Sequence, residues 1–132
     1  MKLAEYFENT KGRGVISTSD KEGNVNAAIY ATPHMMEEGQ IAFIMRDKLT
    51  HKNITENPYA AYLFIAEGAG FKGVRLYLEK TKEEQNSEKI EELSRRKGKY
   101  TEEAELAPKF LVYFNVKKIL PLIGAGDPGV IA

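Results

Sequence analysis

Residues 49–58 read Leu49-Thr50-His51-Lys52-Asn53-Ile54-Thr55-Glu56-Asn57-Pro58, and this stretch is the most informative part of the sequence. Thr50 is a residue type that often caps the start of a helix, and a helix usually ends at or before the residue that precedes a proline. The stretch therefore predicts a short helix over 50–57. It lies between two apolar runs, Ile41–Met45 and Tyr59–Ala66, which predict buried strands.

Four side chains that carry or can take a positive charge gather around the start of this helix: Arg46, Lys48, His51 and Lys52. A helix start also offers unpaired backbone N–H groups and a partial positive charge, and Thr50 adds a hydroxyl. An arginine can bind two phosphate oxygens at once, and a lysine adds a point charge. The pattern is typical of a phosphate-binding site. A capped helix with solvated basic side chains has the same pattern, so both interpretations stay open.

The residues before this stretch predict a short helix and a β-hairpin. Apolar side chains recur at helical spacing in Leu3–Asn9, which predicts the helix. A β-branched run, Val15–Thr18, predicts a strand, and Val25–Thr32 predicts the strand that returns beside it. The turn between them is Asp20–Asn24, which contains a glycine for the position that needs a positive φ.

The residues after Ala66 predict two more strands and a charged segment. Apolar residues occupy every second position of 74–78 and of 110–116, which predicts the strands. Between them, 81–107 is mostly charged. Its first four residues, Thr81-Lys82-Glu83-Glu84, match a helix capping box, and 101–107 predicts a second short helix. We expect a charged helical excursion over 81–107 within a single domain over 1–132.

This order of elements predicts a mainly β (α+β) fold class. About six strands joined by tight turns favour an antiparallel sheet, and few helices remain to cover its faces. Closure into a small antiparallel β-barrel with short peripheral helices is the expected arrangement.

Composition excludes several classes of function. The chain of 132 residues has 19 basic and 19 acidic residues and no cysteine. The zero net charge gives no global signal for binding nucleic acid or an anionic membrane, and we expect neither as a partner. Without cysteine there are no disulfides, thiolate metal sites or cysteine nucleophiles, which fits a reducing cytoplasm. The two histidines, His34 and His51, lack metal-ligand spacing, so we expect no metal site.

The chain resembles the FMN-binding split-barrel proteins of the pyridoxamine-phosphate oxidase-like superfamily. The resemblance rests on the first hairpin over 14–32, on the strand and basic residue over 41–46, and above all on residues 49–61. It implies a small antiparallel split β-barrel, and a homodimer with FMN bound between the subunits. It also implies that the phosphate lies at the helix start and that the backbone of 28–30 lines the isoalloxazine ring. The implied cofactor-binding residues are Ala28, Ile29, Tyr30, Met45, Arg46, Lys48, Thr50, His51, Lys52 and Asn53.

The apolar content of two strands gives a separate reason to expect a dimer. Tyr59–Ala66 and Phe110–Val116 carry more large apolar side chains than a small barrel readily buries, and surplus apolar area usually marks an interface. The sequence therefore predicts an isologous homodimer.

The favoured function is an FMN-dependent oxidoreductase or a small electron carrier. Pyridoxamine-phosphate oxidases carry an Arg-x-His element near the C-terminus, and this chain has no histidine after His51. We therefore do not expect a typical pyridoxamine-phosphate oxidase. The alternative is a non-catalytic protein that binds flavin, haem or deazaflavin on the same barrel.

Overall fold

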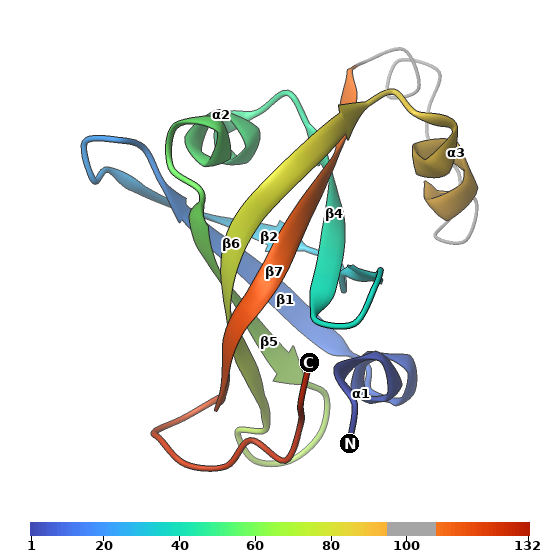
Figure 1. The fold of residues 1–132 in the computed structure, drawn as a ribbon. Helices are drawn as coiled ribbons and strands as arrows, with labels where there is room; N and C mark the ends of the chain where they lie inside the picture. Colours follow the sequence, from blue (N-terminus) through green and yellow to red (C-terminus); the bar gives the residue numbers. More distant parts are fainter. Residues whose placement is uncertain (95–107) are drawn as a thin grey trace.

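Strands β2-β1-β5-β6-β7-β4-β3 lie side by side in one sheet of the computed structural model, which describes residues 1–94 and 108–132 (Figure 1). Every strand pair in it is antiparallel. In chain order the elements are α1 (Leu3–Asn9), β1 (Gly12–Ser19), β2 (Val25–Tyr30), β3 (His34–Met35), β4 (Gln40–Arg46), α2 (Leu49–Glu56), β5 (Tyr59–Ala66), β6 (Gly73–Gln85), α3 (Glu88–Ser94) and β7 (Lys109–Pro121). The predicted antiparallel, mainly β fold with short helices is confirmed.

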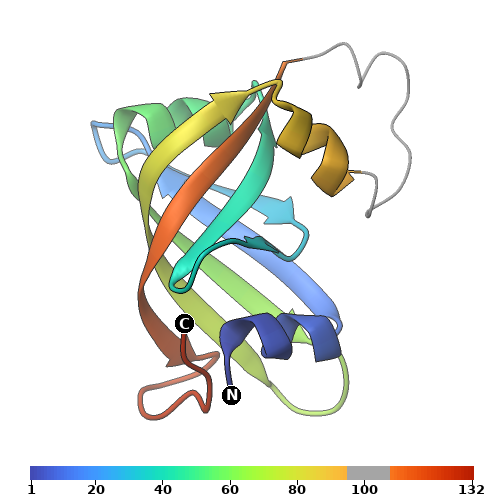
Figure 2. The same cartoon turned by 45° about the vertical axis from the view of Figure 1, so that its right-hand side comes forward.

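The sheet curls into a barrel because its two longest strands bend. Strands β6 and β7 have 13 residues each, and β6 pairs with β5 through its first half and with β7 along most of its length. The pairing register shifts between Tyr77 and Leu78 and again between Lys80 and Lys82. Such irregularities increase the local bend of a strand. Figure 2 shows the result, with β4 and β3 curled back over the layer formed by β1 and β5.

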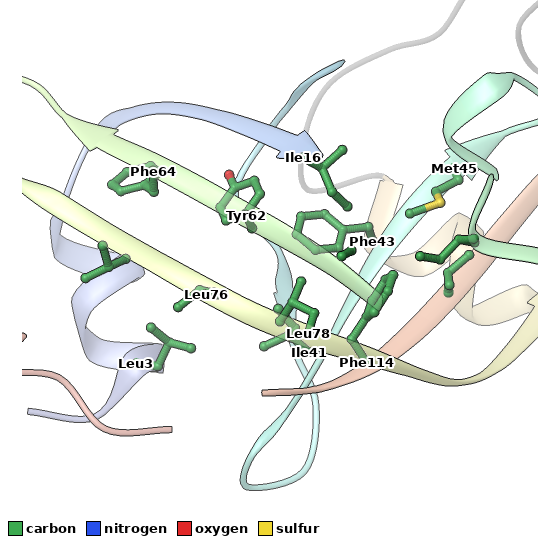
Figure 3. Packing of buried hydrophobic residues seen from close by; sticks show 14 of the residues in the cluster. Leu3, Ile16, Ile41, Phe43, Met45, Tyr62, Phe64, Leu76, Leu78 and Phe114 are labelled. Carbon is green, nitrogen blue, oxygen red and sulfur yellow. The ribbon is translucent and has the colours of Figure 1, made fainter. Parts of the chain in front are cut away.

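The barrel interior is filled by apolar side chains from neighbouring strands. Ile16 of β1 is opposite Tyr62 of β5, which is opposite Leu76 of β6, and all three are fully buried. Phe43 of β4 faces them, with its ring centroid 5.0 Å from that of Tyr62. Figure 3 shows these side chains meeting Leu3 of α1 in one cluster. Burial of this apolar area stabilises the curled sheet.

The first hairpin has the predicted turn. The Asp20 carboxylate accepts hydrogen bonds from the backbone N–H groups of Glu22 and Asn24, both at 2.9 Å. Gly23 has φ of 89°, a value that a residue with a Cβ rarely adopts. The turn residues therefore fix the register of β1 against β2.

The predicted helix start at Thr81 is wrong, because residues 81–85 continue strand β6. Glu83 and Glu84 pair with Val112 and Leu111 of β7, so tertiary pairing overrides the local capping signal. The helix of this segment is α3, which begins at Glu88. The second predicted helix, over 101–107, lies outside the described residues.

The described sheet has seven strands where about six are predicted. The additional strand is β3, a two-residue strand that pairs with β4 at the edge of the sheet. The last strand is also longer than predicted, since β7 continues to Pro121 beside β6.

The apolar side chains of β7 are buried within the chain, which corrects one premise of the dimer prediction. Phe110, Val112 and Phe114 face the barrel interior. Leu111 and Tyr113 face the other way and form a second cluster with Ala42 and with Ile90 of α3. Residues 110–114 of β7 therefore leave little apolar surface for a partner, because the barrel buries one face and α3 covers Leu111 and Tyr113 on the other. In the described part of the chain, no helix combines the length and the apolar composition that crossing a bilayer requires.

Candidate functional site

Helix α2 begins at Leu49, with Lys48 in the N-cap position and no side chain capping it. The prediction of Thr50 as the N-cap is therefore wrong. Thr50 lies in the first turn and is buried, and its side chain approaches that of Tyr30 in β2. Burial raises the pKa of Tyr30, and the nearby Thr50 side chain opposes the rise. The start of α2 thus lies next to the end of β2.

Two asparagines attach the rest of α2 to strand β1. Asn53 donates a hydrogen bond from Nδ2 to the Thr18 hydroxyl at 3.2 Å, and both side chains are buried. At the end of the helix, Asn57 donates from Nδ2 to the Ser19 hydroxyl at 3.0 Å. The predicted stop at Asn57 is confirmed by its extended φ of −139°. These polar contacts hold α2 across one end of the barrel (Figure 1).

The side chain of His51 in α2 faces away from solvent, toward strands β6 and β7. Its ring is stacked on that of Phe110 in β7, with centroids 3.8 Å apart. Its Nε2 lies 3.0 Å and 3.2 Å from the two carboxylate oxygens of Glu83 in β6. Its Nδ1 lies 3.8 Å from Asp47 Oδ1. The predicted phosphate ligand therefore presents both ring nitrogens to carboxylates of its own chain.

The environment of Glu83 favours its charged form. Burial alone would raise the pKa of Glu83, but hydrogen bonds from Lys80 and His51 outweigh that effect and hold the pKa below its ordinary value. Lys80 and Glu83 form an ion pair on β6. The site thus contains a fixed negative charge on the side of His51 that faces the sheet.

Lys48 and Lys52 are the exposed cations of the predicted cluster. The backbone N–H of Lys52 donates to the carbonyl of Lys48 at 3.0 Å, so the two residues lie one helical turn apart at the start of α2. Between them are the N–H groups of the first turn, which have no partner within a helix. Arg46 is half-buried at the end of β4. This set of donors fits the chemistry of a phosphate group.

Strand β2 lies at one edge of the described sheet. An edge strand has backbone N–H and C=O groups that no neighbouring strand uses, so the predicted lining of a flavin ring by backbone atoms fits this position. Ala28 and Tyr30 are half-buried, whereas Ile29 is 76% exposed on the other face. Met45 is fully buried in the barrel core, so its side chain has no free surface for a ligand.

Sequence reasoning missed the residues that hold His51 and Asn53. Glu83, Phe110 and Thr18 come from three strands that are far from α2 in the sequence. No local pattern marks them. Their only signal is that α2 carries polar side chains on the face that a short helix would bury.

The outer face of the sheet is apolar and open to solvent. Val25 and Ile29 of β2 are 83% and 76% exposed, and Tyr59 of β5 is 62% exposed. Across the sheet, Ser17 is opposite both Ala27 and Ala61, so small side chains lie between the larger ones. A groove of about 300 Å³ follows this face. It is lined by Ser17, Thr18, Ser19, Val25, Asn57, Tyr59, Ala60, Ala61 and Tyr77.

Comparison with known proteins identifies the fold. No protein-family model matches the sequence, and no curated protein sequence matches it. An FMN-binding protein from Syntrophomonas wolfei subsp. wolfei superposes with a TM-score of 0.76 and 21% identity, over 95% of this chain and 86% of that chain. HutZ, the haem storage protein from Vibrio cholerae, superposes with a TM-score of 0.69 and 17% identity, over 92% of this chain and 95% of that chain. An F420 reductase superposes with a TM-score of 0.66 and 14% identity, over 87% of this chain and 94% of that chain.

Structures described as putative pyridoxamine 5'-phosphate oxidases are also similar to this chain. All of these proteins have an antiparallel barrel of the same kind. The chain therefore has the split-barrel fold that the sequence resemblance predicts.

Proposed function

We propose that this chain binds FMN, with the phosphate at the start of α2 and the isoalloxazine ring beside β2. The observation that carries the proposal is the contact between α2 and β2, where the side chains of Thr50 and Tyr30 approach each other. It brings the open backbone edge of β2 next to the first turn of α2. A phosphate site and a ring-lining strand are thus neighbours on one side of the barrel, as a flavin mononucleotide requires.

Each end of the ligand has matching groups on the chain. Lys52 and the first-turn N–H groups hold the phosphate, and Arg46 adds a second cation from the end of β4. Backbone groups of β2 hydrogen-bond the polar edge of the ring. Lys48, exposed at the N-cap position, supplies a positive charge for the N1/C2 edge of a reduced ring. Of the remaining predicted ligands, Thr50 and Asn53 act by fixing the position of the helix.

A second copy of the chain covers the open outer face of β2 and β5. This face has exposed apolar side chains at Val25, Ile29 and Tyr59, with small residues between them. Exposed apolar area of this kind is costly in water and is usually covered by a partner. Because β2 presents Ile29 to this face and its free edge to the ring, a homodimer would place the second copy beside the flavin.

Bound FMN would supply redox chemistry by accepting a hydride or single electrons. The chain's part is to orient the ring, exclude water from one side of it and stabilise negative charge. An oxidoreductase and a small electron carrier both use these features. Reduction of the flavin by NAD(P)H followed by oxidation by an added acceptor, with turnover, favours the enzyme.

The alternative is a protein that holds a flavin, haem or deazaflavin without catalysis. Its support is the similarity of the fold to a haem storage protein and to an F420 reductase. Haem requires an axial ligand, and the chain has two histidines. His51 is bonded to Glu83, and His34 lines a cavity of only about 90 Å³. These contacts favour flavin over haem.

Fluorescence and absorbance spectroscopy together test the proposal. The protein is purified, then titrated separately with FMN, haem and a deazaflavin. The proposal expects saturable quenching of FMN fluorescence at one flavin per chain, and flavin bands that bleach on reduction. Saturable haem binding with a Soret shift, and no FMN quenching, would overturn it.

A further inference from the structure

His51 occupies a position between two acidic groups that belong to different parts of the site. Its Nε2 is hydrogen-bonded to Glu83 of β6, and its Nδ1 is 3.8 Å from Asp47 in the loop before α2. The stacked Phe110 ring fixes the plane of the imidazole. Only 9% of the residue is exposed, so solvent does not compete freely for either nitrogen.

We propose that His51 is a positioning residue for the phosphate site, and that its protonation tightens the binding of a phosphate-bearing ligand at the start of α2. The inference rests on the proposed FMN site. His51 does not touch the ligand in this account. It acts through Asp47 and through the first turn of the helix.

The number of N–H groups on the ring is the basis of the effect. A neutral imidazole has one N–H, and an imidazolium has two. The neutral ring donates to Glu83 from Nε2 and then turns a lone pair toward Asp47. The protonated ring donates from both nitrogens. Protonation therefore draws Asp47 toward the helix, and Asp47 directly precedes the N-cap residue Lys48.

Fixing this loop organises the groups that bind an anion. The side chain of Asp47 is 68% exposed, so in the neutral state it is held weakly. Once it is bound to His51, the loop that leads into α2 is held in one position. The imidazolium also adds a positive charge within the first turn of α2. Both changes favour a phosphate dianion.

The other charged groups around the ring oppose this effect only in part. On β6, Glu83 is paired with Lys80, so its charge is already compensated. On β7, the ring faces Phe110, which carries no charge, and the neighbouring Lys109 is buried. On α2 itself, the charged neighbour is Lys52, which is exposed. Among these groups, Asp47 is the exposed carboxylate that lies next to Nδ1 of the ring.

The test compares FMN and riboflavin binding between pH 6 and pH 8 in the wild type, His51→Gln and Asp47→Asn. Glutamine keeps a donor for Glu83 but does not titrate in this range. The FMN phosphate itself titrates near pH 6, and His51→Gln provides the correction because the ligand is the same. As the pH is lowered from 8 to 6, the ratio of the FMN dissociation constant of the wild type to that of His51→Gln should fall by about threefold to tenfold. Riboflavin binding should be unaffected in both.

Asp47→Asn keeps the proposal testable if His51→Gln fails to fold, because Asp47 is exposed. It should lose most of the extra pH dependence and bind FMN at pH 8 at least as tightly as the wild type. A ligand-free readout is the pH titration of the Asp47 and Lys48 amide signals by NMR, which should follow a histidine titration in the wild type and not in His51→Gln. Equal pH slopes in all three proteins would overturn the positioning role while leaving the FMN site intact. A wild type that does not prefer FMN over riboflavin at any pH would overturn the site and the inference together.

Discussion

Asn53 of α2 and Thr18 of β1 form a buried hydrogen bond of 3.2 Å between the helix and the sheet. The two residues are 35 positions apart in the sequence, so the contact fixes α2 against the barrel rather than stabilising a local turn. The positions of Lys52 and of the first-turn N–H groups, which are assigned to the phosphate, depend on this attachment. Asn53 is thus a cofactor-site residue in an indirect sense.

Asn53→Ala should lower the free energy of unfolding by about 1–3 kcal/mol, because it leaves the buried Thr18 hydroxyl without its donor. Chemical denaturation at neutral pH measures the change. The matched control is Asn115→Ala, since Asn115 is exposed on β7 and its replacement should alter stability by less than about 0.5 kcal/mol. Equal stability of the two variants would contradict the role of the hydrogen bond.

Helix α3 should open before the barrel does. One fully buried aliphatic side chain, Ile90, connects it to Ala42 and to Leu111 of β7. Hydrogen exchange followed by mass spectrometry should give faster exchange in Glu88–Ser94 than in β4. Ile90→Ala should accelerate exchange in α3 by at least about tenfold, because losing a buried isoleucine costs about 2–5 kcal/mol, and should leave β4 unchanged. Equal protection of α3 and β4 in the wild type would contradict the prediction.

Glu83 should make the stability of the protein depend on pH in the acidic range. Its pKa lies below the ordinary value of 4.5, because hydrogen bonds from Lys80 and His51 outweigh the effect of burial. A carboxyl whose pKa is lower in the folded state stabilises that state at pH values above the unfolded pKa. That contribution is lost as the pH falls through the folded pKa.

The wild type should therefore be more stable than Glu83→Gln at pH 7, and the difference should shrink as the pH is lowered below 4.5. Urea denaturation at a series of pH values gives the difference. Glu22→Gln is the control, because Glu22 is exposed in the β1–β2 turn. A difference that stays constant with pH would mean that Glu83 contributes through packing alone.

Ala61→Arg should dissociate the proposed homodimer. Ala61 lies on the outer face beside Tyr59, where a long charged side chain would be buried by a second copy. Light scattering at micromolar concentration should give the dimer mass for the wild type and the monomer mass for this variant. Lys117→Ala, at an exposed position on β7, should remain dimeric. A monomeric wild type with FMN bound would refute the dimer.

The sheet was predictable from the sequence because its signals are local. The alternation of apolar residues in 74–78, the glycine turn after Asp20 and the proline after Asn57 each act within a few residues. The prediction of a helix start at Thr81 failed because contacts between distant parts of the sequence override the local signal. A capping box is a local signal too, but residues 82–85 gain more by pairing with residues of β7 that are 25 to 31 positions away in the sequence.

The candidate site also has features that local sequence signals predict and features that they do not. The basic residues at the start of α2 were visible as a cluster because they are adjacent in the sequence. The direction of each side chain was not visible, since it depends on which face of α2 meets the sheet. His51 and Thr50 face inward to Glu83 and Tyr30, and Lys52 faces outward.

The central claim is that a phosphate binds at the start of α2, and Lys52→Ala tests it most directly. FMN differs from riboflavin by the phosphate alone, so only FMN should respond to this variant. A charge-assisted hydrogen bond contributes about 1.5–3 kcal/mol, which corresponds to a rise of about tenfold to a hundredfold in the FMN dissociation constant. Lys117→Ala is the matched control and should leave both ligands unchanged. Flavin-fluorescence titrations of the wild type and both variants give the constants. The account predicts weaker FMN binding and unchanged riboflavin binding in Lys52→Ala, and an equal effect on both ligands, or on neither, would contradict it.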